Sequence, residues 1–122
     1  MKSFMISLGL LAVLLSGVLI NHLYIKDVFA HMSAEIDALP DVGDADCPAA
    51  VQDLASYWDR QIDLVSLSVS YPIVDRICEH VATLLACAEC NDLFGYRTAL
   101  ALLRDALGDM MRFEAPSIGT LL

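Results

Sequence analysis

The longest apolar segment of the chain lies at its N-terminal end. No charged residue occurs between Phe4 and Ile20, and the only polar side chains there belong to Ser7 and Ser16. About 17–25 helical residues are needed to cross the hydrocarbon core of a bilayer. This segment is at the short end of that range, and the apolar residues that follow it extend it. The pattern predicts a transmembrane helix over residues 1–24, with the lipid bilayer contacted through Phe4–Ile20.

A second apolar pattern continues beyond this segment and predicts that the same helix runs on to about Leu39. Its members recur at alternating spacings of four and three residues, which is typical of an amphipathic helix. They are Ile25, Phe29, Met32, Ile36 and Leu39. Pro40 ends the pattern, because the residue before a proline avoids the helical region. We expect this stripe to pack into the core of the following domain. Homodimerisation through the same stripe, as a coiled-coil stalk, is the alternative.

Three further helices are predicted after an acidic loop at residues 41–47. Pro48 suits the start of the first, Ser70-Tyr71-Pro72 forms a turn before the second, and Asp92 caps the third. Each helix carries an apolar stripe at helical spacing: Ala50, Val51, Leu54, Trp58, Ile62 and Val65; Val74, Ile77, Val81, Leu84 and Ala88; Leu93, Tyr96, Leu100, Leu103, Leu107 and Met110. Short connections favour antiparallel neighbours. The prediction is an all-α protein in which the transmembrane helix continues into a small up-down antiparallel bundle, residues 25–115, followed by a tail at residues 116–122.

The distribution of charge predicts the orientation of this chain in a membrane. Lys2 precedes the apolar segment, whereas all sixteen acidic residues and five of the seven basic residues lie from Asp27 onward, so that part carries −11. The positive-inside rule then places the N-terminus in the cytoplasm and the helical domain outside, on a single-pass protein of the cell membrane. A cleaved signal peptide ending at Val28-Phe29-Ala30 is the alternative. We favour an uncleaved anchor, because cleavage sites usually follow the apolar segment closely.

The acidity of the chain also limits its partners. Its net charge is −9, and nucleic-acid binding requires a basic surface, so we expect no nucleic-acid partner. The same charge disfavours adsorption to anionic lipid. The acidity fits a solvated surface, or a basic partner such as a cationic peptide. An unidentified protein partner or a second copy of the chain is compatible with this composition.

Four cysteines are the residues that invite a chemical interpretation. Cys87-Ala88-Glu89-Cys90 has the spacing of a thiol-exchange motif, but it is predicted at the end of a helix, where the dipole does not activate a thiolate. With His80 it supplies an incomplete set of zinc ligands, so no metal site is predicted. An exported domain can form disulfides, and its four cysteines can pair in three ways. The other interpretation is that all four cysteines are small apolar packing residues, and we favour it for Cys78.

No motif predicts catalysis or a cofactor. The chain has no serine in a nucleophile-elbow setting and no glycine-rich phosphate loop. His22, His31 and His80 are scattered, and Trp58 lies on an apolar helical face where a core position is expected. We therefore expect a non-enzymatic interaction or structural module of the cell envelope. An envelope redox or metal-binding protein that uses Cys87 and Cys90 is the alternative.

Several segments together resemble an uncharacterised family of small membrane-anchored proteins from Gram-positive bacteria, the domain of unknown function 4363 type. They are the Met1-Lys2-Ser3-Phe4 start, the helix around Trp58 that leads into Leu64–Val69, Ile73–Ile77 and Leu100–Leu107. The resemblance covers nearly the whole chain and is mostly one of apolar spacing. It implies a membrane anchor followed by helices, and it brings no catalytic residues.

Overall fold

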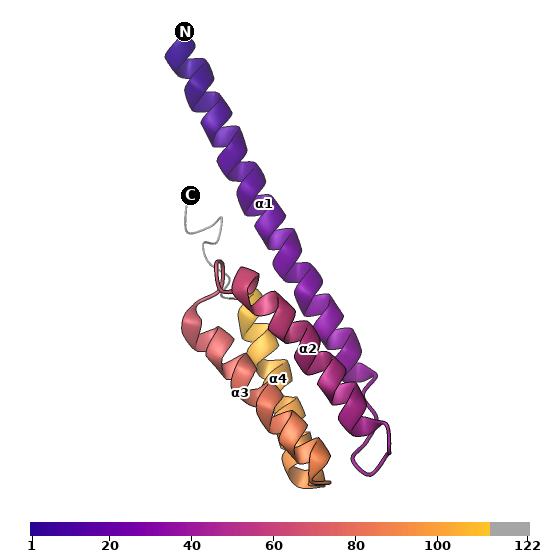
Figure 1. Ribbon diagram of the computed structural model, residues 1–122. Helices are drawn as coiled ribbons and strands as arrows, with labels where there is room; N and C mark the ends of the chain where they lie inside the picture. The colour runs from indigo at the N-terminus through magenta and orange to yellow at the C-terminus, as the bar shows by residue number, and fades with distance from the viewer. Residues whose placement is uncertain (113–122) are drawn as a thin grey trace.

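The computed structural model describes residues 1–112, and these form four α-helices with no strand among them (Figure 1). The helices are α1 (Lys2–Asp37), α2 (Cys47–Val65), α3 (Tyr71–Glu89) and α4 (Leu93–Arg112). Successive helices are antiparallel, each packs against the next, and α4 also packs against α1. The predicted all-α up-down bundle is confirmed. The predicted tail, residues 116–122, lies outside the described residues.

The first helix has two parts with different surroundings. Every side chain before residue 18 is exposed, and this part of α1 extends beyond the other three helices (Figure 1). In the described part of the chain, α1 is the one helix long and apolar enough to cross a membrane. From Ile25 onward one side of α1 enters the core, through Ile25, Val28, Met32 and Ile36. The extension therefore packs into the bundle, as expected from its apolar stripe.

One member of that stripe was predicted at the wrong position. Val28 is buried, whereas Phe29 is only half-buried against the edge of the core. The observed run at 25, 28, 32 and 36 has the same average spacing, close to the 3.6 residues of a helical turn, as the predicted run at 25, 29, 32 and 36. Helical period therefore does not distinguish Val28 from Phe29. The prediction placed Phe29 in the stripe by its spacing, and the helices packed against α1 bury Val28 instead.

The faces that α2, α3 and α4 turn toward the core are largely those predicted. The buried positions that the stripes identified are Val51, Leu54, Trp58, Val65, Val74, Ile77, Val81, Leu84, Ala88, Tyr96, Leu103, Leu107 and Met110. Leu93 is an error: it is 44% exposed, because it is the first residue of α4 and lies at the rim of the bundle. Small residues such as Ala99 and Ala106 are buried in addition, where they allow α4 to approach its neighbours closely.

Three aromatic side chains connect neighbouring helices through their polar ends. The Tyr96 hydroxyl donates to the carbonyl of Pro40 at 2.9 Å, and the Tyr24 hydroxyl donates to Gln61 at 2.5 Å. The indole N–H of Trp58 donates to Cys78 Sγ at 3.2 Å. Buried tyrosine and tryptophan stabilise a core when their polar atoms find such partners. These contacts connect α1 to α2, α2 to α3, and the loop after α1 to α4.

The connection between α3 and α4 is set by adjacent capping residues. Asn91 adopts a left-handed conformation with φ 55°, and the amide of Asp92 donates to the carbonyl of Cys87 at 3.0 Å, as in a Schellman cap. The Asp92 carboxylate then accepts from the amide of Gly95 at 3.0 Å. Asp92 is therefore the N-terminal cap of α4, as its residue type predicted.

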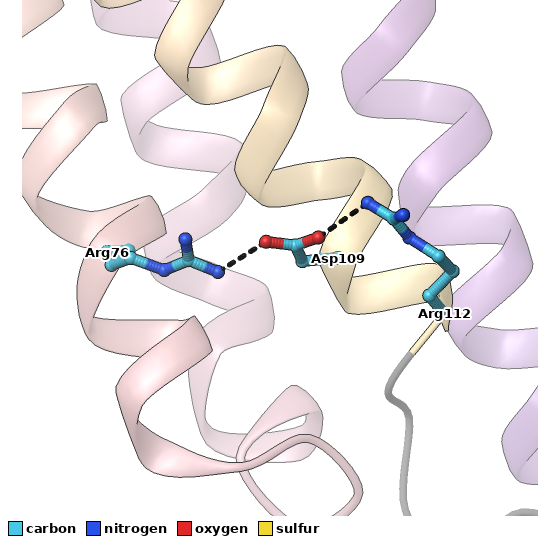
Figure 2. Close-up of polar contacts among 3 residues, drawn as sticks. All are labelled: Arg76, Asp109 and Arg112. Carbon is cyan, nitrogen blue, oxygen red and sulfur yellow. Dashed lines mark hydrogen bonds and ion pairs between the residues drawn. The ribbon is translucent and has the colours of Figure 1, made fainter.

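An ion-pair cluster joins the other ends of α3 and α4 (Figure 2). Asp109 lies between two guanidinium groups, with Arg76 of α3 at 2.6 Å and Arg112 of its own helix at 2.7 Å. The Asp109 side chain is 16% exposed, and both arginines are more exposed. The hydrogen bond from Arg76 is the largest cause that lowers the pKa of Asp109, and the two positive charges add to it.

This cluster predicts a specific dependence of stability on pH. Because the folded-state pKa of Asp109 is depressed, its contribution to stability is present above the unfolded value of 3.8 and is lost as the pH falls through the folded value. We expect Asp109→Asn to lower the melting temperature at neutral pH, with a difference from the parent that shrinks toward pH about 3. Asp105→Asn, at an exposed position of the same helix, is the matched control. A constant difference across this range contradicts the assignment.

Candidate functional site

The cysteine pair at the end of α3 is the first candidate site. All four cysteines are free: Cys47 is buried, Cys78 and Cys87 are half-buried, and Cys90 is exposed. The structure does not form the disulfides that the sequence left open. Cys87 Sγ lies only 2.8 Å from the position that a β-carbon on Gly95 would occupy. Its thiol therefore packs against the first turn of α4 and does not project into solvent.

The surroundings of Cys87 oppose thiolate chemistry. Burial raises its pKa, and the nearby Asp92 carboxylate and Cys90 raise it further. Both cysteines lie at the C-terminal end of α3, where the partial charge of the helix also opposes a thiolate. The arrangement has the opposite electrostatics to a thiol-exchange centre.

These surroundings predict unequal reactivity of the two cysteines. At neutral pH in the folded chain, we expect Cys90 to react with iodoacetamide at least about tenfold faster than Cys87, because reactivity follows thiolate fraction and access. Mass spectrometry of peptides after timed labelling measures both rates. Faster labelling of Cys87 contradicts this prediction and supports the alternative of a redox protein.

The residues considered for a metal site do not gather. Within residues 1–112, no group of three or more histidine, cysteine, aspartate or glutamate side chains is arranged to hold a metal ion. His80 lies seven residues before Cys87 on α3, about 10 Å along the helix axis. The structure therefore does not bring His80, Cys87 and Cys90 into one ligand set.

A stacked histidine–tyrosine pair lies where the extension of α1 meets α2. The rings of His31 and Tyr57 are stacked, with their centroids 3.8 Å apart and an angle of 18° between their planes. His31 Nε2 is 2.9 Å from Glu35, one turn farther along α1. Burial raises the pKa of Tyr57, with nearby acidic groups adding to it. This contact joins two helices of the bundle.

An exposed apolar groove on α4 is the second candidate site, and the sequence stripes missed it. Phe94 is 83% exposed, and Leu93 and Leu102 are also exposed. The groove has a volume of about 500 Å³, and its lining residues are Leu93, Phe94, Arg97, Thr98, Ala101 and Leu102. Phe94, Thr98 and Ala101 follow helical spacing on the side of α4 opposite to the core. This second, weaker stripe is the signal in the sequence that could have indicated the groove.

The groove lies at the end of the bundle that is farthest from the apolar N-terminal segment. α4 begins at the end of the bundle that lies farthest from the exposed part of α1 (Figure 1). The groove occupies the first half of α4 and thus lies away from the apolar N-terminal segment. A large apolar side chain such as Phe94 is stabilised by transfer out of water, at about 25 cal/mol for each Å² that a partner covers. The groove has the physical character of a contact surface.

Comparisons with known proteins add no relative. No protein-family model, no curated protein and no solved structure matches the chain. The resemblance to the uncharacterised Gram-positive family stays a prediction.

Proposed function

We propose that this protein is a membrane-anchored interaction module of the cell envelope, with no catalytic role. In this proposal residues 1–24 cross the cell membrane once with the N-terminus in the cytoplasm, and residues 25–115 form the extracytoplasmic domain. The observation that carries the interaction role is the exposed groove around Phe94, at the membrane-distal end of the bundle.

The first part of α1 supports the anchoring. Its exposed side chains are almost all apolar from Phe4 to Ile20, and such a surface is unfavourable in water. A bilayer removes this cost, and a helix satisfies its own backbone hydrogen bonds in lipid. The excess of acidic residues after Asp27 supports an extracytoplasmic bundle.

The chemistry of the groove indicates its partner. Phe94 and Leu102 offer apolar contact, and Arg97 places a guanidinium in the same lining. A protein segment with a large apolar side chain beside a carboxylate complements this surface, because arginine binds carboxylates with two parallel hydrogen bonds. The partner class is thus a protein with an acidic apolar segment.

A photo-crosslinking amino acid at position 94 tests this function. In intact cells we expect a discrete adduct from position 94, and none from the same amino acid at Asp105, which is exposed on the same helix. Adding Leu102→Asp is expected to reduce the adduct at least about fivefold, because a carboxylate in the groove opposes both apolar contact and an acidic partner. Equal adducts at both positions, or none at 94, contradict the proposal.

The alternative of an envelope redox or metal-binding protein uses Cys87 and Cys90. The raised pKa of Cys87 and the dispersed arrangement of His80 argue against it. Stoichiometric zinc or disulfide reductase activity that is lost in a Cys87→Ser, Cys90→Ser double variant decides for this alternative.

A further inference from the structure

Outside α1, the exposed large apolar side chains of residues 1–112 fall into two groups. One is the groove of α4 described above, and the other surrounds the connection between α2 and α3. This second group consists of Leu64, Leu67 and Tyr71, and Leu67 is 82% exposed. We define these three residues as the apolar tip. No part of the proposed interaction role uses them.

The apolar tip lies beside the proposed membrane-spanning segment. Because α2 is antiparallel to α1, its C-terminal end returns toward the exposed part of α1 (Figure 1). The Ser68 hydroxyl donates a hydrogen bond to Asn21 Oδ1 of α1. An open groove of about 350 Å³ lies between the two segments, lined by Val13, Leu14, Gly17, Val18, Asn21, Leu67 and Ser68.

The position of this contact along α1 places the apolar tip within the hydrocarbon layer of a bilayer. If the span ends near Tyr24, Gly17 lies seven residues earlier, which is about 10 Å below the membrane surface. Leu67 lines the same groove as Gly17 and Val13. We infer that the α2–α3 connection is a second membrane contact, in which Leu67 enters the hydrocarbon layer beside α1 and lipid acyl chains fill the groove. This inference rests on the anchoring in the proposed function.

Four backbone amides of the connection have partners that suit an apolar environment. The amides of residues 66–69 all donate within the turn, to the carbonyls of Ile62, Leu64 and Val65. The Ser66 hydroxyl donates to the carbonyl of Ile62 at 2.6 Å. Irregular backbone enters lipid at high cost when its polar groups lack partners, and here the donors are satisfied.

The residues around the tip set how deeply it enters. Tyr71 is exposed at the start of α3, and tyrosine favours the boundary between hydrocarbon and headgroups. Asp63 and Asp75 are exposed on either side of the tip and oppose deeper insertion. The bundle is thus seated on the bilayer surface, with α1 and Leu67 as two points of attachment.

Tryptophan fluorescence in phosphatidylcholine vesicles tests this contact. The full chain with Leu67→Trp is compared with Phe94→Trp, an equally exposed position at the other end of the bundle. The parent protein supplies the background from Trp58. We expect lipid brominated along its acyl chains to quench the added tryptophan at 67 at least twofold more than that at 94. Aqueous acrylamide is expected to show the reverse order.

The outcomes separate the tip from the anchor. If the variants float with the vesicles but acrylamide quenches positions 67 and 94 equally, the contact of the apolar tip with the bilayer is contradicted. The membrane anchoring through α1 is not contradicted by that result. A tryptophan at 67 that neither quencher reaches is covered by protein, such as a second copy, and this also overturns the lipid contact. If the parent does not float with the vesicles, the anchoring itself fails. Equal melting temperatures of the variants and the parent confirm that Leu67→Trp leaves the fold intact.

Discussion

Replacing Met32 with aspartate is expected to abolish the cooperative unfolding of the bundle. Met32 is 0% exposed and lies on the face of α1 that packs into the core. An unpaired carboxylate at such a position costs about 3–5 kcal/mol or forces the group to protonate. That cost is comparable to the whole stability of a domain of this size, roughly 5–10 kcal/mol. We therefore expect α1 to separate from α2 and α4.

Circular dichroism of the full chain in detergent micelles measures this effect. The matched control is Ala34→Asp, which adds the same charge at an exposed position two residues along α1. We expect the control to melt within a few degrees of the parent, since surface substitutions change stability by less than about 0.5 kcal/mol. If Met32→Asp melts like the control, the extension of α1 is a stalk outside the folded core, and homodimerisation becomes the better explanation of its stripe.

Removing the indole of Trp58 is expected to be the next most damaging change. The side chain is 3% exposed in the middle of α2, and its N–H donates to Cys78 on α3. Truncating a buried tryptophan to alanine removes apolar contact and leaves a cavity, which together cost about 3–5 kcal/mol. Because α2 contacts both α1 and α3, loosening it affects both sides of the bundle.

The conservative variant separates the two contributions of Trp58. Trp58→Phe keeps much of the ring and loses the N–H, so we expect a loss of only about 1–2 kcal/mol. Trp58 is the only tryptophan of the chain, so both variants are followed by circular dichroism instead of fluorescence. Parent-like melting of Trp58→Ala is incompatible with a core position for this residue.

Local sequence was sufficient wherever the deciding interaction is local. Asp92 caps α4 through a hydrogen bond to an amide three residues away, so the residue type at the boundary predicts the start of the helix. The core stripes of α2 and α3 were predicted for the same reason, because apolar spacing reports which side of a helix is buried. The clearest error, Leu93, lies where a stripe meets the end of a helix and the core no longer covers it.

The candidate surfaces left a weaker signal in the sequence: Phe94, Thr98 and Ala101 follow helical spacing, but no stripe includes Leu67. Phe94 and Leu67 lie outside the predicted core stripes, and both are largely exposed. Their exposure depends on which helices lie beside them, and it is decided by contacts between segments far apart in the chain. The Asn21–Ser68 hydrogen bond joins residues 47 positions apart, and no local spacing indicates it.

The sequence by itself determined that the chain is helical, that its first segment is long and apolar enough to span a membrane, and which face of each later helix is apolar. These properties follow from residue type and from the 3.6-residue period, which act within a few turns. Only the tertiary structure decided that the extension of α1 packs into the core instead of dimerising, and that Val28 and not Phe29 is buried there. It also decided that Cys87 packs against Gly95 and that two apolar groups stay exposed at opposite ends of the bundle. The physical reason is that burial and pKa depend on the neighbours a fold supplies, and a single stripe does not specify those neighbours.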